Sequence, residues 1–496
     1  MQKKCTITLH PLGESVEVNA GTPLTDILHE FGVEFPCGGK GTCGRCRVRL
    51  LKGELTADKF QKDKLKKLNL GGDWRLACCC VAESDITLEV SEFENIILAD
   101  NSTFEFVPQT GFGLAIDLGT TTVVVQLVDL SNGQILDSVS FVNPQSKFGS
   151  DLISRIESCL DGNHETMKVL IRDRIGEVIK LILYRHKVTV SKVVIVGNTV
   201  MHHIFSGIDV RPLSFYPFES ENSGVQLFPS SSTGWDLPEN TSIKFLPSIG
   251  SFVGSDILAG IAATHMADND EYTILIDLGT NGEIVLGNRK KILCASTAAG
   301  PAFEGGKISQ GMRASTGAVS SVSYENGMLR CHVIGNVSAK GICGSGLIDI
   351  VSILLQNGEI GIFGEFNSGE TSYKLTSGVA VSQQDIREFQ LAKAAIAAGL
   401  DILLKKAGIT YNVVSRVYIA GGFGNFLNIE NVIKTGLIET TEEKIIKFGN
   451  TALLGAKMFL FDDRNIMDKI LSVTEHINLE GEAGFQDIFV DKLMLF

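Results

Sequence analysis

A chain of 496 residues is too long for one ordinary hydrophobic core, so its length predicts two or more domains. The composition, 44% hydrophobic and 20% charged residues, is typical of a globular protein, and the formal net charge of −13 argues against a nucleic-acid-binding protein. No apolar run approaches the roughly 20 residues of a membrane span, and no signal peptide is visible behind the first lysines. We therefore expect a cytoplasmic protein with neither nucleic acid nor membrane among its partners.

Residues 1–92 are predicted to form a small α/β unit. Short stretches of alternating apolar residues indicate strands, and Pro23 lies at an early helical position, where proline is favoured. The strands are expected at residues 6–9, 16–18, 46–51 and 86–90, and the helices at residues 24–31 and 59–70. Residues 93–111 lack such a pattern and end in Pro108 and Gly111, so we interpret them as a linker.

Six of the eleven cysteines lie between Cys37 and Cys80, which indicates a metal site in this unit. The glycine-rich loop holds Cys37, Cys43 and Cys46 with the spacing C-x5-C-x2-C, and a fourth candidate ligand follows at Cys78. Zinc sites usually pair their cysteines as two separate C-x2-C units, whereas three ligands on one loop and one distant ligand are typical of a plant-type 2Fe–2S ferredoxin. Zinc remains the alternative metal, and the two residues after Cys78 are alternatives for the fourth ligand, with core packing as their other role.

From residue 112 the pattern changes to long apolar strands that alternate with helices, which is typical of α/β layers. Residues 115–122 (AIDLGTTT) recur as residues 275–282 (LIDLGTNG). Each copy is an apolar strand, an aspartate, a tight glycine turn and a second apolar strand, so the repeat predicts two similar halves that face each other. We place these two lobes at residues 112–268 and 269–496.

The two repeated turns are the predicted phosphate-binding loops. Successive backbone N–H groups in such a turn form a concave anion site, and the carboxylates of Asp117 and Asp277 can position Mg²⁺ or an attacking water. Phosphate contacts are expected from Gly119, Thr120, Thr121 and Thr122 in the first loop and from Gly279, Thr280 and Asn281 in the second. A third element, residues 418–425 (YIAGGFGN), runs from a strand into Gly421 and Gly422, where the bare backbone can lie against an adenosine.

Further polar residues have less specific patterns. Glu304 is a candidate for orienting water or substrate, and a solvated loop carboxylate is the alternative interpretation. Four others are expected to pack or to lie at the surface rather than to reach the nucleotide: Asn143, Lys147, His202 and His203. Lys393, on the predicted amphipathic helix 383–406, is expected to snorkel, with its stem along apolar surface and its ammonium group in water. No Walker loop is present, and no G-x-G-x-x-G motif follows a strand, so a Rossmann dinucleotide site is not supported.

Taken together, the chain resembles the reductive activators of corrinoid-dependent methyltransferases. The distinctive stretches are residues 143–156 (NPQSKFGSDLISRI), 197–202 (GNTVMH), 297–305 (TAAGPAFEG) and 343–347 (CGSGL). The resemblance implies an N-terminal β-grasp 2Fe–2S ferredoxin-like domain joined to a two-lobed ATPase of the actin, sugar-kinase and Hsp70 superfamily, with a ribonuclease H-like fold. It also favours Cys78 as the fourth iron ligand.

The resemblance further implies ATP-dependent reduction of an inactive Co(II) corrinoid protein to Co(I), with one electron from the 2Fe–2S cluster and with ATP and Mg²⁺ in the ATPase. The implied partners are the corrinoid protein of a methyltransferase system and a low-potential electron donor, and homodimerisation is expected from the resemblance alone. Three alternatives stay open: an activator of another low-potential metalloenzyme such as a radical dehydratase, a small-molecule kinase with a regulatory ferredoxin domain, and a nucleotide-gated binding protein.

Overall fold

The computed structural model describes most of the chain. The described residues are 3–10, 13–28, 31, 33, 41–42, 44, 46–68, 70–90, 104–220, 222–279, 281–325, 328–421, 424 and 427–496. Four predicted site residues lie outside these ranges: Cys37, Cys43, Thr280 and Gly422. Within the described ranges, no helix combines the length and the apolar character that crossing a membrane requires.

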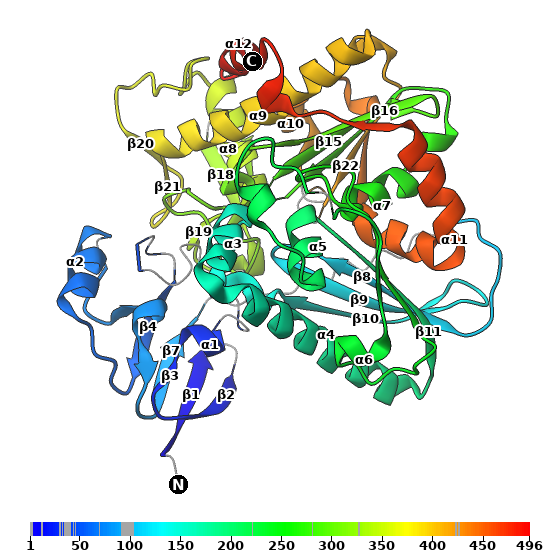
Figure 1. The fold of residues 1–496 in the computed structure, drawn as a ribbon. Helices are drawn as coiled ribbons and strands as arrows, with labels where there is room; N and C mark the ends of the chain where they lie inside the picture. Colours follow the sequence, from blue (N-terminus) through cyan, green and yellow to red (C-terminus); the bar gives the residue numbers. More distant parts are fainter. Residues whose placement is uncertain are drawn as a thin grey trace.

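The N-terminal module is built on a five-stranded mixed sheet (blue in Figure 1). Its elements are β1 (Lys4–His10), β2 (Glu14–Asn19), β3 (Thr22–Pro23), α1 (Thr25–Leu28), β4 (Arg47–Lys52), α2 (Lys59–Lys67), β5 (Trp74–Leu76), β6 (Val81–Ala82) and β7 (Ile86–Glu89). The strand order is β2-β1-β7-β4-β5, with β1 antiparallel to β2 and parallel to β7. Alternate residues such as Ile7, Leu9 and Leu88 are fully buried, as a sheet with one covered face requires. The mixed sheet confirms the predicted fold of this unit.

The first lobe contains a six-stranded sheet with the order β10-β9-β8-β11-β13-β12. Its strands are β8 (Phe112–Leu118), β9 (Thr122–Asp129), β10 (Ile135–Val142), β11 (Val190–Gly197), β12 (Gln226–Phe228) and β13 (Ser242–Phe245). β8, β9 and β10 form an antiparallel meander, and β11 and β13 continue the sheet parallel to β8. The outer face is covered by α3 (Leu152–Ser158), α4 (His164–His186) and α5 (Thr199–Ser206), and α6 (Ser230–Thr233) follows β12.

The second lobe repeats this topology. Its sheet has the order β23-β22-β14-β15-β16-β24, from β14 (Thr273–Leu278), β15 (Gly282–Asn288), β16 (Lys291–Thr297), β22 (Arg416–Ala420), β23 (Ile445–Gly449) and β24 (Thr474–His476). β14, β15 and β16 form the antiparallel meander, and β22 and β23 are parallel to β14. Each strand of the meander therefore has a counterpart in the first lobe, which confirms the two similar halves predicted from the repeated sequence.

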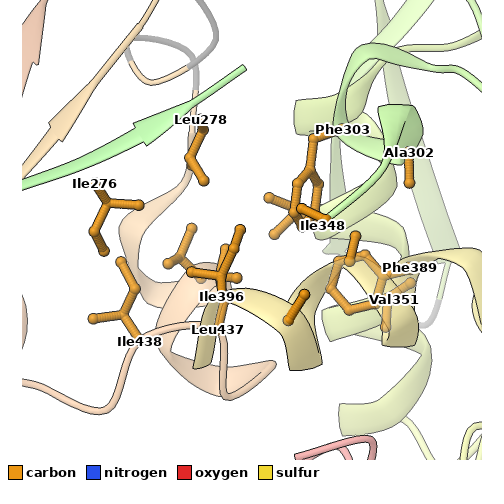
Figure 2. Packing of buried hydrophobic residues seen from close by; sticks show 14 of the residues in the cluster. Ile276, Leu278, Ala302, Phe303, Ile348, Val351, Phe389, Ile396, Leu437 and Ile438 are labelled. Atoms are coloured by element: carbon orange, nitrogen blue, oxygen red, sulfur yellow. The ribbon is translucent and has the colours of Figure 1, made fainter. Parts of the chain in front are cut away.

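The outer face of the second lobe carries the largest hydrophobic core. It is covered by α8 (Gly344–Gln356), α9 (Gln383–Ala407), α10 (Ile429–Lys434) and α12 (Phe485–Asp491). Figure 2 shows Phe303 and Phe389 packed beside Ile348 and Val351, and the two phenyl rings meet edge to face with centroids 5.9 Å apart. Smaller strands extend this lobe: β17 (Ala318–Glu325), β18 (Met328–Val333), β19 (Gly341–Ile342), β20 (Ser372–Lys374) and β21 (Ala380–Ser382).

Two helices, α7 (Ser255–Ala263) and α11 (Thr451–Val473), join the lobes. They share one core with the inner faces of both sheets, including Ala115 of β8 and Leu275 of β14. The helices cross closely because Gly455 has no side chain, and a Cβ atom there would lie 2.1 Å from the carbonyl oxygen of Ala259. The junction between the lobes is therefore tightly packed.

We expect Gly455→Ala to lower the midpoint temperature of thermal unfolding. Replacing glycine by alanine inside a helix ordinarily stabilises it by about 1 kcal/mol, so a loss of stability would come from the forced separation of α7 and α11, which costs about 1–3 kcal/mol or more. Gly224→Ala is the control, because nothing lies within 4 Å of its added Cβ atom. An unchanged or higher midpoint for Gly455→Ala would contradict the tight crossing.

Candidate functional site

The ferredoxin-type module brings two of the predicted iron ligands together. Cys46 directly precedes β4, and Cys78 lies in the 3-10 turn Ala77–Cys79 that follows β5. Their Sγ atoms are 3.2 Å apart, and the Ala77 backbone N–H donates to the Cys46 carbonyl oxygen at 2.7 Å. Two thiolates on one tetrahedral metal with bonds near 2.3 Å lie about 3.8 Å apart, so this pair fits a shared iron.

The neighbouring cysteines face other surroundings. Cys80 is buried, with its Sγ atom 3.8 Å from the side-chain amide of Gln61. Cys79 is exposed and faces Gly41, where an added Cβ atom would lie 3.0 Å from its Sγ atom. The geometry therefore favours Cys78 over Cys80 as the fourth ligand. Among the described residues, which leave out Cys37 and Cys43, no group of three or more potential metal ligands is found.

Each predicted phosphate loop is a hairpin turn after an aspartate. In the first, the Gly119 N–H donates to the Thr122 carbonyl oxygen at 3.1 Å, and a Cβ atom on Gly119 would lie 2.6 Å from that oxygen. In the second, the Gly279 N–H donates to the Asn281 carbonyl oxygen at 3.1 Å. Asp117 and Asp277 stand at equivalent positions, one residue before the end of β8 and β14.

The first loop is held from behind by buried polar side chains. Arg155 of α3 is fully buried and donates to the Thr120 carbonyl oxygen and, at 3.0 Å, to that of Gly149. Asn143 donates to the Gly119 carbonyl oxygen at 2.9 Å, and Asn198 donates to Oγ1 of Thr120 at 2.9 Å. These bonds satisfy carbonyl oxygens of the loop inside the protein and hold the loop in one conformation. The Gly119 N–H is already used within the turn, so an anion would be met by other N–H groups of the loop. Asn143 is buried as expected, and it also positions the loop.

Carboxyl groups from both lobes gather beside these loops. Burial raises the pKa of Asp117 to about 6, although a hydrogen bond from Asn450 lowers it. Burial, with the nearby Asp117 and Glu304, raises the pKa of Asp277 to about 7. The pKa values of Asp256 and Glu283 are raised as well, by burial and by carboxylates around them. The group is electrostatically costly by itself. No three of these described carboxylates converge closely enough to hold a metal ion, but a bound divalent cation would relieve their repulsion.

Asp256 and Glu283 did not emerge from the sequence analysis. Asp256 is the second residue of α7, and Glu283 is buried in β15, where it is the strand partner of Asp277. The sequence did hold a local signal for Glu283, because this residue comes directly after the second repeated turn, which ends at Gly282. Asp256 had none, since its approach to Asp277 depends on how α7 packs between the sheets.

The starts of the two central helices meet the aspartates of the opposite lobes. Asn450 caps α11 by accepting from the Leu453 N–H at 2.8 Å, and its Nδ2 atom donates to Oδ2 of Asp117 at 2.9 Å. At the start of α7, burial and the nearby charge of Asp277 together raise the pKa of Asp256. The partial positive charge of both helix N-termini is therefore directed toward the place where the anionic groups gather.

The third predicted element lies beside the second loop. Gly421 follows β22 with φ of 85°, and a Cβ atom there would lie 2.7 Å from Oδ1 of Asp277. Its N–H donates to the Gly449 carbonyl oxygen at 3.0 Å. Only glycine lets the backbone approach Asp277 in this conformation, and its predicted contact with adenosine stays a prediction.

The other polar candidates have structural surroundings. His202 and His203 are buried and hydrogen-bonded to the carbonyl oxygens of Gly224 and Thr199, at 3.1 and 2.7 Å. Lys147 pairs with Asp26 of the N-terminal module at 3.7 Å. The snorkelling arrangement considered for a lysine on helix 383–406 is wrong. Lys393 is fully buried and donates to the carbonyl oxygens of residues 492 and 494, so it anchors the C-terminal segment.

Comparisons with known proteins agree with this architecture. Family models match residues 7–83 (2Fe–2S iron–sulfur cluster binding domain), 112–269 (RACo middle region) and 271–496 (C-terminal domain of RACo, the ASKHA domain). The corrinoid activation enzyme RamQ of Eubacterium limosum is 31% identical over 446 residues, covering 82% of this chain and 75% of the relative. This chain belongs to the RACo family of corrinoid reductive activators.

Two further members of this group are similar over most of the chain. The [Co(II) methylated amine-specific corrinoid protein] reductase of Methanosarcina barkeri is 27% identical, covering 77% of this chain and 76% of the relative. A solved structure of a reductive activator for a corrinoid, iron–sulfur protein superposes with a TM-score of 0.68 at 28% identity, covering 99% of this chain and 98% of that one. The predicted combination of a ferredoxin-type domain with an ASKHA domain is thus confirmed.

The cysteine geometry predicts different results for neighbouring substitutions. Cys78→Ala should lose most of the bound iron and the visible absorption of the protein purified without oxygen, because one iron would lack a thiolate. Cys80→Ala is the matched control and should keep both, since its Sγ atom lies beside Gln61. Iron analysis and visible spectra check this, and loss of iron in Cys80→Ala but not in Cys78→Ala would contradict the assignment.

The carboxyl cluster predicts that Asp256→Asn stabilises the nucleotide-free protein. The amide keeps the shape of the carboxyl group but removes one member of a crowded set of buried acids. We expect the midpoint of thermal unfolding to rise by a few degrees, while Asp173→Asn, an exposed residue of α4, changes it little. A fall in the midpoint for Asp256→Asn would contradict a repulsive cluster.

Proposed function

We propose that this protein uses ATP to drive one electron from a 2Fe–2S cluster to an inactive Co(II) corrinoid protein, which is returned to the Co(I) state. The observation that carries the proposal is the combination, in one RACo-family chain, of the adjacent thiols of Cys46 and Cys78 with two facing phosphate loops. The names of two relatives, a corrinoid activation enzyme and a Co(II) corrinoid protein reductase, support the substrate class.

In the N-terminal module, Cys37, Cys43, Cys46 and Cys78 would hold the cluster. When bound, such a cluster supplies a one-electron carrier with a reduction potential of about −400 mV. The hydrogen bond from the Ala77 N–H to the Cys46 carbonyl oxygen fixes the turn of Cys78 against the loop, so the two thiols are oriented before a metal arrives.

In the two lobes, Asp117 and Asp277 would position Mg²⁺ and the phosphates of ATP. The backbone N–H groups of the two loops, around Thr120 and Asn281, would bind phosphate oxygens, while Gly421 and Gly422 would lie against the adenosine. Asp256 and Glu283 would orient the attacking water or accept its proton, because a carboxyl group with a raised pKa is suited to proton transfer near neutral pH. Glu304, whose charge contributes to the raised pKa of Asp277, would orient water beside them.

A movement caused by nucleotide binding would be passed to the N-terminal module through a short series of contacts. Asn143 holds the first phosphate loop and begins the 3-10 helix Pro144–Phe148, and Lys147 of this helix pairs with Asp26 of the N-terminal module. A shift of the loop would therefore move the contact between the ATPase and the module. The work required is modest, because one electron moved uphill by 100 mV costs about 2.3 kcal/mol.

The decisive experiment mixes the chemically reduced protein with Co(II) corrinoid proteins without oxygen. We expect the EPR signal of Co(II) to disappear, and the visible spectrum of Co(I) to appear, only when Mg²⁺ and ATP are both present. Cys78→Ala should abolish the reaction by removing the electron carrier, and Asp117→Asn with Asp277→Asn should lower its rate at least about 100-fold.

Two results would contradict the proposal. Reduction of Co(II) at the same rate without ATP would remove the ATPase from the mechanism. A phosphorylated small molecule formed at normal rates by Cys78→Ala would instead favour a kinase with a regulatory ferredoxin domain. The predicted homodimer and the identity of the electron donor are separate predictions, to be tested by light scattering and by rapid mixing with candidate donors.

A further inference from the structure

Helix α2 concentrates positive charge in an acidic protein. Its nine residues, KFQKDKLKK, contain five lysines and one aspartate, whereas the whole chain has a formal net charge of −13. Lys59, Lys62 and Lys66 follow helical spacing and are exposed on one face of the helix. Gln61 and Leu65 are buried on the other face, and the Gln61 side chain accepts from the Leu76 N–H at 2.8 Å. Because these contacts hold the helix in place, the lysines are not needed for packing.

The same helix lies against a described part of the segment that holds the predicted iron ligands. Gly41, between Cys37 and Cys43 in the sequence, is so close to α2 that an added Cβ atom would lie 3.0 Å from the ring of Phe60. Phe60 is itself 52% exposed, beside the lysines. A protein docked on α2 would therefore lie beside the segment of the predicted iron ligands, at the exposed ring of Phe60.

The position of α2 separates it from the nucleotide machinery. α1 contacts the lobes through the pair of Asp26 and Lys147, whereas α2 lies at the outer left edge of the module in Figure 1, away from α3 and α4. A corrinoid partner whose reduction depends on ATP has to contact the lobes. A protein that only delivers electrons to the cluster does not, so the face of α2 is better suited to an electron donor.

We propose that α2 is the docking surface for a small electron-donor protein that carries acidic residues around a low-potential redox centre. This inference rests on the proposed 2Fe–2S function of the module. The reduced centre of the donor loses one electron and the oxidised 2Fe–2S cluster gains it, and no bond or proton changes. The acidic remainder of the chain repels such a donor while the lysines attract it, and fields of this kind raise association rates by about 10- to 1,000-fold.

The test uses a reduced, acidic two-cluster [4Fe–4S] ferredoxin as the probe, mixed rapidly with the full-length oxidised holoprotein. Lys62→Glu with Lys66→Glu should lower the second-order rate constant of electron transfer at least about tenfold at low ionic strength. The difference should disappear in about 0.5 M salt, where the Debye length is only about 4 Å. The neutral pair Lys62→Gln with Lys66→Gln should show an intermediate loss.

The control carries the same change of net charge in another place. Lys180→Glu with Lys290→Glu reverses two exposed lysines of the lobes and should leave the rate within about twofold of the original protein. An equal loss in this control would show an effect of net charge alone and would overturn the proposal. Equal rates for the α2 variants and the original protein at low salt would overturn it as well.

Separate measurements distinguish failure of this inference from failure of the proposed function. Iron content and EPR of each variant report whether the cluster is present. After chemical reduction, the α2 variants should reduce Co(II) corrinoid protein with ATP at the original rate, because the donor is no longer needed. If that rate falls while the cluster is intact, α2 is the surface for the corrinoid protein and the assignment to a donor is wrong.

Discussion

The collection of carboxyl groups between the two lobes is the constraint on which the two-lobed part of this structure depends. Asp117, Asp256, Asp277 and Glu283 come from both lobes and meet where burial disfavours their charged forms. Such a set is unfavourable by itself, so the helices that hold it must be firmly packed. The interlocked pair α7 and α11, which shares one core with both sheets, provides that support. The stability of this region is in part the means of keeping the acids together.

The N-terminal module follows a different principle, since its site depends on a short turn and not on a large core. Cys46 and Cys78 are brought together by one backbone hydrogen bond and by the anchoring of α2 through Gln61. The neighbouring Cys80 is turned toward the interior by the same anchoring. The buried side chain of Gln61 thus distinguishes the inward thiol of Cys80 from the thiol of Cys78, which lies beside Cys46.

Features with a local pattern could be predicted from the sequence, and features made by tertiary contacts could not. The cysteine spacing and the repeated Asp-Leu-Gly-Thr turn predicted the fold class and the two facing halves, because both are short segments with a fixed chemistry. Arg155 and Asp256 gain their roles from residues far away in the chain. Lys393 was misjudged for this reason, since the carbonyl groups that satisfy it lie about 100 residues further along.

The close crossing of α7 and α11 also limits how the two lobes can move relative to each other. With the backbone of Gly455 resting on that of Ala259, the two helices have no side chain between them at this point of contact. Elsewhere along the pair, side chains such as Leu258 and Leu453 pack in the shared core. Sliding of one helix along the other would bring side chains against this crossing, whereas a rotation of the lobes about it would disturb the contact least. In such a rotation the displacement of an atom grows with its distance from the contact. A small change near the phosphate loops would therefore move the outer edges of the lobes furthest.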